Sequence, residues 1–120
     1  MKKPTPEQVE TMMTEKMGAL PSSLNAAKAI DPEFLVDQAI SSKMSMQSEA
    51  NPFDPKTSMM LALATSITLS SDECVMEQTR MLKKMGITKE ELAFLVRIVK
   101  HAHTSAVMGS AKAAFETFES

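Results

Sequence analysis

The sequence predicts an all-helical protein, and two kinds of observation lead to this fold class. Only three of the 120 residues are glycine, and no stretch alternates apolar and polar residues as a half-buried strand does. Helix start signals, in contrast, recur along the chain as Thr-Pro, as two Asp-Pro pairs and as two Ser/Thr-x-x-Glu boxes. We therefore expect a bundle of five to seven helices, formed by a single domain over residues 1–120.

The N-terminal helix is expected within residues 1–20. Thr5 is placed to cap a helix that runs through "PEQVETMMTEKMG", because its side-chain oxygen can accept from the first turn. Gly18 stands near the end of this helix, where glycine closes many helices in the left-handed conformation. These two residues set the predicted boundaries.

Two leading helices and a linker follow within residues 21–50. The first is short and occupies "PSSLNAAKAI". The second, "DPEFLVDQAISSKM", has the stronger start signal, with Asp31 as the cap and Pro32 at the first helical position. The polar stretch "SMQSEANPF" ends in Asn-Pro, so it predicts a linker.

The core of the protein is expected in residues 54–118. Its first helix, "DPKTSMMLALATSITL", is apolar on nearly all sides, which predicts a central, buried helix. A chain of 120 residues offers little to cover such a helix on every side. We therefore expect a homotrimer or homohexamer with extensive apolar contacts between its subunits.

Two capping boxes mark the helices that come next. Ser70-x-x-Glu73 is expected to open a helix that Gly86 closes, and Thr88-x-x-Glu91 is expected to open "KEELAFLVRIVKHAH". A separate last helix is expected in "SAVMGSAKAAFETF", where an internal glycine weakens it.

Composition argues against several classes of partner. The net charge is −2 with both signs scattered along the chain, so neither nucleic acid nor an anionic membrane is an expected partner. The longest weakly polar run is too short to cross a bilayer, and the N-terminal lysines precede no apolar stretch of the kind found in secretory signals. A single cysteine cannot form an internal disulfide, which suits the cytoplasm. Twelve methionines either fill the core or adapt to subunit interfaces.

That single cysteine, Cys74, falls in the first turn of a predicted helix. At about 100° per residue, it shares one face with Gln78, Met81, Leu82 and Met85. It is therefore expected to point inward. The helix dipole favours its thiolate form, whereas the two preceding acidic residues oppose it, and no histidine or lysine lies one turn away to act as a base. These residues alone favour a buried, inert cysteine.

The stretch "DPKTSMMLALATSITLSSDECVMEQTRMLKKMGITKEELAFLVRIV" resembles the carboxymuconolactone decarboxylase and alkylhydroperoxidase D-like family. That family opens a helix with a similar Asp-x-Lys-Thr segment. Its peroxidase branch starts the next helix with Cys-x-x-Cys and a histidine one turn later, and a Gly, a Thr or Ser, and a Glu-Glu helix follow. The resemblance runs roughly from Asp31 to Phe118. It implies an alkylhydroperoxidase D-like helical bundle that assembles into trimers or hexamers of intertwined helices.

Compared residue by residue, the resemblance implies a catalytic site that has lost most of its parts. Cys74 falls on the second cysteine, the thiol that attacks peroxide, and Ser71 falls on the first, resolving cysteine. Gln78 falls on the histidine, and Met59 falls on the glutamate that heads the proton relay. A serine cannot close the disulfide that follows oxidation. The decarboxylase branch also lacks the cysteine pair, but it carries a histidine where this chain has Gln78, so the chain departs from both branches.

Two histidines and several sulfur atoms are the other candidates for chemistry. His101 and His103 lie where the family has a break near its pocket; on a continuous helix they face apart by about 200° and cannot share a ligand. A break there would bring one of them to the face of Cys74, and otherwise both are exposed histidines near a helix end. Cys74, Met81 and Met85 would suit Cu(I) on one face, but core packing explains the same spacing, so we expect no metal and no organic cofactor. The hydroxyl-rich "ATSITLSSD" is expected to line a small pocket.

Three functions remain open at this point. The first is a one-cysteine thiol peroxidase or reductase of the peroxiredoxin type, with Cys74 as nucleophile, Gln78 as its hydrogen-bond partner and an external thiol as reductant. The second is a decarboxylase or isomerase that acts on a small organic acid, with His101 or His103 as general acid or base. The third is a non-catalytic binding or scaffolding homo-oligomer, which the loss of the relay residues favours.

Overall fold

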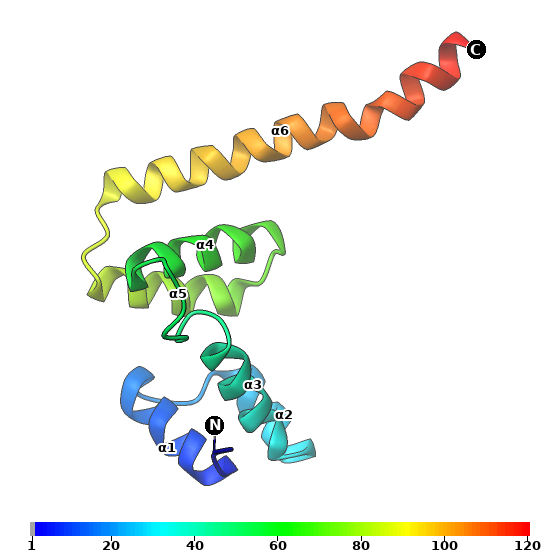
Figure 1. Cartoon of the computed structure of the whole chain (residues 1–120). Coiled ribbons are helices and arrows are strands. Elements are labelled where there is room, and N and C mark those ends of the chain that lie inside the picture. Colours follow the sequence, from blue (N-terminus) through cyan, green and yellow to red (C-terminus); the bar gives the residue numbers. More distant parts are fainter. Residues whose placement is uncertain (1) are drawn as a thin grey trace. The chain divides into compact units, whose positions relative to one another are not determined.

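The computed structural model describes residues 2–120, and within this range it contains helices and no strands. The helices are α1 (Pro6–Met17), α2 (Ser22–Ile30), α3 (Glu33–Lys43), α4 (Pro55–Thr68), α5 (Asp72–Lys84) and α6 (Lys89–Glu119) (Figure 1). The all-helical class and the expected number of helices are confirmed. The chain divides into two compact units, one ending at Asp54 and the other beginning at Pro55. That the whole chain acts as a single domain stays a prediction.

The first helix has the boundaries that the sequence predicts. The hydroxyl of Thr5 accepts a hydrogen bond from the amide of Gln8 at 3.2 Å, and the side-chain oxygen of Gln8 accepts from the amide of Thr5 at 2.9 Å. At the other end, Gly18 has φ 85°, and its amide donates to the carbonyl of Thr14 at 2.8 Å. Both ends of α1 are thus satisfied by local hydrogen bonds.

The start of α3 differs by one residue from the prediction. Pro32 is the N-cap residue, so Glu33 is the first helical residue. Asp31 still caps the helix, because its Oδ1 accepts from the amide of Glu33 at 3.0 Å. The predicted linker, residues 45–53, lies between α3 and α4 and contains turns and no helix.

The first unit has a small core of its own, built by α1 and α3 with the segment between α1 and α2. Its buried apolar side chains are Val9, Leu20, Leu35, Val36 and Ala39. On its surface, the Lys28 ammonium group of α2 lies 2.8 Å from a carboxylate oxygen of Glu10 in α1. This unit is therefore held by apolar burial together with one partly exposed ion pair.

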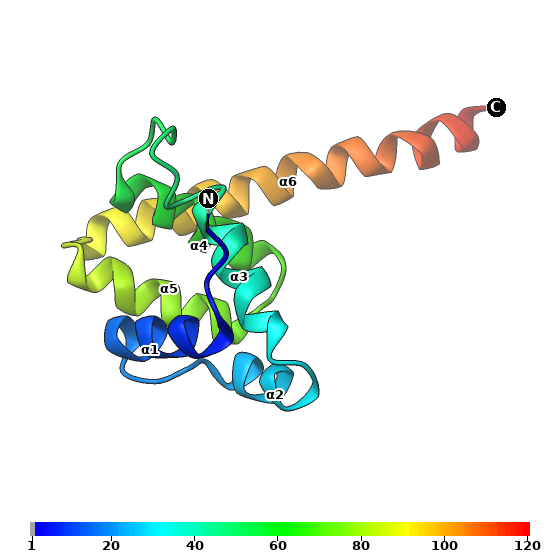
Figure 2. The same cartoon turned by 60° about the horizontal axis from the view of Figure 1, so that its bottom comes forward.

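In the second unit, α4 and α5 lie side by side and run in opposite directions (Figures 1 and 2). The chain reverses between them within three residues, and Ser70 takes a left-handed conformation with φ 57°. Ser71 is the N-cap of α5, and its hydroxyl makes no capping hydrogen bond. The predicted capping box from Ser70 to Glu73 is therefore wrong, because the tight turn forces Ser70 out of the extended conformation that an N-cap needs.

The core of the second unit joins α4, α5 and α6. Its buried apolar side chains are Leu63, Leu82, Leu95 and Val99, and partly buried methionines, among them Met59 and Met85, pack against them. Within one chain α4 is not buried on all sides, because α5 and α6 cover only part of it; Leu61 on this helix is 52% exposed. The prediction of a central, buried helix is therefore wrong for the single chain.

The last helix, α6, is continuous over 31 residues. The predicted capping box opens it, since the Thr88 hydroxyl accepts from the amide of Glu91 at 3.0 Å and Glu91 Oε1 accepts from the amide of Thr88 at 2.9 Å. The prediction of two separate helices is wrong. Gly109 lies inside the helix, where a glycine costs only about 1 kcal/mol relative to alanine, and the flanking alanines favour the helix.

The second half of α6 extends beyond the helices that it packs on. At about 1.5 Å per residue, α6 is roughly 46 Å long and α4 roughly 21 Å. In both views α6 projects past α4 and α5 (Figures 1 and 2). Large apolar side chains on the projecting part are exposed, namely Val107, Met108, Phe115 and Phe118. This segment of the unit thus carries apolar surface that α4 and α5 leave uncovered.

Candidate functional site

Cys74 is the third residue of α5, and its thiol is free and exposed. The prediction that it points inward is wrong for the single chain. The side of α5 that enters the core is defined by Val75 and Leu82, which lie within about 20° of each other around the helix. Cys74 lies about 80° from Leu82 around the helix, so its side chain is outside the side of α5 that enters the core. The thiol is therefore accessible to small molecules in solution.

Two residues that the sequence associates with Cys74 lie on either side of it along α5. Ser71 is the N-cap, three residues before the thiol, and its hydroxyl is not used for capping. Gln78 lies one turn after the thiol, and its Oε1 is buried with no hydrogen-bond partner among the described residues. A buried acceptor of this kind costs about 1–3 kcal/mol. Gln78 is thus a polar residue whose buried side-chain oxygen accepts no hydrogen bond from the described residues.

The general base and the acid of the proton relay are not assembled around Cys74 within the chain. Across residues 2–120, no hydrogen bond or ion pair joins Cys74 to a histidine. Met59, which stands at the position of the relay glutamate, packs against the apolar core of the second unit. Its environment suits an apolar side chain, in agreement with the residue found there.

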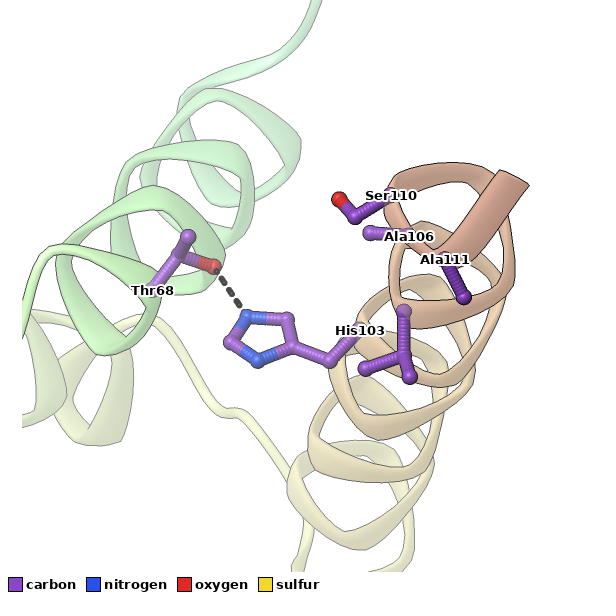
Figure 3. Close-up of a pocket in the computed structure, with 6 residues that line it drawn as sticks. Thr68, His103, Ala106, Ser110 and Ala111 are labelled. Atoms are coloured by element: carbon purple, nitrogen blue, oxygen red, sulfur yellow. Dashed lines mark hydrogen bonds between the residues drawn. The ribbon is translucent and has the colours of Figure 1, made fainter. Parts of the chain in front are cut away.

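A second candidate site is an open groove between the end of α4 and the middle of α6, with a volume of about 640 Å³. We call it the α4–α6 groove; Figure 3 shows residues that line it. Its lining consists of Thr68, His103, Ala106, Val107, Ser110 and Ala111. The α6 residues recur every three or four positions, so they share one side of the helix. The groove is mostly apolar, with two hydroxyls and one imidazole as its polar groups.

The hydrogen bonds of Thr68 determine the role of the imidazole in this groove. The Thr68 hydroxyl donates its proton to the carbonyl of Ala64 at 3.1 Å, so it can only accept toward His103, whose Nε2 lies 3.4 Å away (Figure 3). Nε2 of His103 is therefore the donor of this long hydrogen bond. In the neutral ring Nδ1 then carries the lone pair, so His103 presents a basic nitrogen.

The structure does not bring His101 and His103 together. Because α6 is continuous, the two side chains leave the helix about 200° apart, and only His103 lines the groove. No break at this point is needed for His103 to reach α4. Among the described residues, no three His, Cys, Asp or Glu side chains gather closely enough to hold a metal ion.

The sequence anticipated only part of this groove. Thr68 lies in the hydroxyl-rich "ATSITLSSD", which was expected to line a pocket, and His103 was a candidate for acid–base chemistry. Ala106, Val107, Ser110 and Ala111 were missed. Their spacing from His103 is the signal that could have found them, since residues three, four, seven and eight positions apart share a helix face.

The fold and the candidate sites define a small all-helical protein with one exposed thiol and one histidine-lined groove. A family model described as the carboxymuconolactone decarboxylase family matches residues 42–117, which is more than half of the chain. The chain therefore belongs to the carboxymuconolactone decarboxylase family, as the resemblance in the sequence predicted. The comparison with curated proteins found no match. Within residues 2–120, none of the helices has both the length and the apolar character that spanning a membrane demands.

Proposed function

We propose that this chain is a one-cysteine thiol peroxidase or reductase within its family, with Cys74 as the nucleophile. The observation that carries the proposal is the exposure of Cys74 in the first turn of α5. Attack by the sulfur requires that small molecules reach it, and the exposed position provides this access. An exposed thiol can also meet both a peroxide and an external thiol, and the chemistry requires both encounters.

The proposed reaction has three balanced steps. The Cys74 thiolate attacks one oxygen of a peroxide, the O–O bond breaks, and the leaving oxygen takes a proton from solvent, so the products are a sulfenic acid on Cys74 and an alcohol or water. An external thiol then attacks the sulfenic sulfur, which forms a mixed disulfide and releases water. A second external thiol attacks the mixed disulfide, releases Cys74 as a thiol and leaves as part of an external disulfide. Such chemistry fits the cytoplasm, where thiols are kept reduced.

Ser71 and Gln78 are proposed to hold the sulfur and its oxidised form. The hydroxyl of Ser71 makes no capping hydrogen bond and lies one turn before Cys74. The amide of Gln78 lies one turn after it and can donate a hydrogen bond to a sulfenate without transferring a proton. With no base close by, the proton of the Cys74 thiol must leave to solvent.

The test is peroxide consumption with an added dithiol as reductant, compared between the wild type and Cys74→Ser. Loss of consumption in Cys74→Ser, with dimedone labelling of Cys74 in the wild type, is the expected result, because dimedone reacts with sulfenic acids. Met76→Leu is a matched control, since this side chain also contains sulfur, is exposed on α5 and lies two residues away. Equal consumption by the wild type and Cys74→Ser would rule the proposal out.

The second candidate function places acid–base chemistry on a small organic acid in the α4–α6 groove. The observation in its favour is the hydrogen bond from His103 to Thr68, which leaves Nδ1 as a basic nitrogen beside an apolar wall. Butyrate is a suitable probe, because its carboxylate can bind a protonated imidazole and its chain can contact the alanines. We expect butyrate to shift the ring NMR signals of His103 and to leave those of His101 unchanged. Equal shifts of both rings would rule out binding in the groove.

We further propose that the chain forms a homo-oligomer, a homotrimer or a homohexamer. The apolar side chains exposed on α4 and on the second half of α6 support this, because an isolated soluble domain rarely leaves so much apolar surface in contact with water. Sedimentation at micromolar protein is the test. A stable monomer would exclude this part of the proposal and leave the thiol chemistry unaffected.

A further inference from the structure

The α4–α6 groove presents polar groups at two points along α6. His103 and Ser110 are seven residues apart, and at about 100° per residue their side chains leave the helix within about 20° of each other. A rise of about 1.5 Å per residue separates them by about 10 Å along the helix axis. Figure 3 shows both side chains, together with Ala106, on the side of α6 that faces Thr68. The groove therefore has two polar ends and an apolar middle.

The hydroxyl of Ser110 is available to a ligand, whereas that of Thr68 is already used. The Thr68 hydroxyl donates to a carbonyl one turn earlier in α4, at 3.1 Å, and faces the ring of His103. On α6, Thr104 likewise donates to the carbonyl of Lys100 at 3.0 Å, which is a common bond of serine and threonine inside a helix. The side chain of Ser110 makes no hydrogen bond within residues 2–120. It can therefore both donate to a ligand and accept from it.

Positive charge lies at the His103 end of the groove. Lys100 is three residues before His103 and within about 60° of it around α6, so an ammonium group and an imidazole stand near each other there. The charged residues nearest to Ser110 along the helix are Lys112 and Glu116, which leave α6 about 160° and 120° away from it. An anionic group therefore suits the end at His103, and an uncharged group that forms hydrogen bonds suits the end at Ser110.

We propose that the α4–α6 groove binds an unbranched ω-hydroxy acid of about six carbons, such as 6-hydroxyhexanoate. The carboxylate accepts from the protonated imidazole of His103, whose bond to Thr68 is long at 3.4 Å and is exchanged for a charge-assisted one. The terminal hydroxyl pairs with the hydroxyl of Ser110. The ligand lies beside α6, so its hydrogen bonds run across the groove and its chain spans most of the distance of about 10 Å between the two residues.

The apolar middle of the groove favours an unbranched chain. Ala106 and Ala111 have only methyl side chains, so a narrow hydrocarbon chain can contact α6 closely between the two polar ends. The large apolar side chains exposed on the second half of α6 point elsewhere, since Met108 and Phe115 leave the helix about 160° and 140° from Ser110. A ligand in the groove can therefore bind while Met108 and Phe115 contact another subunit.

This ligand class rests on the second candidate function, the binding of a small acid at His103. Ser110 adds to it a second contact, about two helical turns away, that selects among acids. The proposed thiol chemistry is independent of the groove, because none of the residues that line it is Cys74.

Two acids of nearly equal length and shape, 6-hydroxyhexanoate and heptanoate, test the contact with Ser110. Their dissociation constants are measured by NMR titration of the full chain at one fixed pH, with the ring of His103 as the reporter. The wild type is expected to bind 6-hydroxyhexanoate roughly two- to tenfold more tightly than heptanoate, which is the contribution of one hydrogen bond. Ser110→Ala is expected to abolish this preference. Ser105→Ala is the matched control, because Ser105 is on the same helix about 140° from Ser110.

Two further acids test the length of the ligand and the charge at its far end. Glycolate carries the same two groups on two carbons and cannot reach both residues, so Ser110→Ala should leave its binding unchanged. Pimelate has a second carboxylate in place of the hydroxyl, and it should bind less tightly than 6-hydroxyhexanoate because no cation faces it beside Ser110. Tighter binding of pimelate, or an effect of Ser110→Ala on glycolate, would overturn the assignment of the far end.

Butyrate separates a failure of this assignment from a failure of the candidate function. If butyrate shifts the ring signals of His103 and Ser110→Ala keeps the wild-type preference, the contact with Ser110 does not exist, and acid binding at His103 stands. If none of the acids shifts that ring, butyrate included, acid binding in the groove and the ω-hydroxy acid are both ruled out.

Discussion

Replacing Ser71 by cysteine and Gln78 by histidine is the most informative change to the proposed thiol site. Ser71→Cys introduces a second thiol three residues before Cys74, at an N-cap whose hydroxyl makes no capping hydrogen bond, so little stability should be lost. Gln78→His removes an oxygen that is buried without a partner among the described residues, and such an oxygen costs about 1–3 kcal/mol. The new imidazole would lie one turn after Cys74. A positioned general base contributes about 10²–10⁴-fold, so the double variant should consume peroxide at least about 10²-fold faster than the wild type.

The assay is peroxide consumption with a dithiol reductant, after circular dichroism and sedimentation have shown that the variant folds and assembles as the wild type does. Mass spectrometry then shows whether a disulfide joins positions 71 and 74. Ser71→Cys alone is the control, because it supplies the resolving thiol without the base. A disulfide that forms normally, with no gain in rate, would refute the reasoning. The surroundings of Cys74 would then be built for something other than peroxide, and the groove enzyme and the binding oligomer would remain.

Three further predictions concern the second unit. Leu82 is fully buried, so Leu82→Ala should lower the free energy of unfolding by about 2–5 kcal/mol, whereas Leu69→Ala, at a 72% exposed side chain, should change it by less than about 0.5 kcal/mol; equal urea midpoints would contradict this. Met59→Glu should lower it by at least about 2 kcal/mol, because it brings a carboxylate without a partner into an apolar cluster; an unchanged midpoint would show that this position is solvated. The hydrogen bond from Lys56 and the adjacent helix cap lower the pKa of Glu91, so its contribution to stability is present above the ordinary value of 4.5 and is lost as the pH falls below it. Glu91→Gln should therefore flatten the acid side of the stability curve, and an unchanged slope would contradict the assignment.

Local signals in the sequence predicted α1 to α5 and several helix ends correctly. Thr5, Gly18 and Thr88 act where they were expected, because capping depends on hydrogen bonds within a few residues. The box from Ser70 to Glu73 failed for a reason that is not local. The chain must turn back within three residues to pack α5 on α4, and that requirement fixes the conformation of Ser70.

The orientation of α5 shows a second limit of the sequence. The apolar residues of α5 are compatible with two different faces pointing to the core. One face contains Cys74 and Met81, and the other contains Val75 and Leu82. Only the packing of α5 against α4 selects the residues that face the core, so the exposure of Cys74 could not be predicted from helical spacing. The continuity of α6 is similar, since a single glycine weakens a helix without ending it.

Dimedone labelling of Cys74 in the folded protein, followed by peptide mass spectrometry, tests the central claim most directly. Oxidised methionines also add oxygen to the protein, so added mass alone does not identify the oxidised residue. Dimedone does, because it reacts with the sulfenic acid at Cys74. With peroxide alone the label should appear on the peptide that contains Cys74. With peroxide and 2-mercaptoethanol it should be replaced by a mixed disulfide. A Cys74 peptide that stays an unmodified thiol in the folded protein, and reacts only after denaturation, would contradict the account.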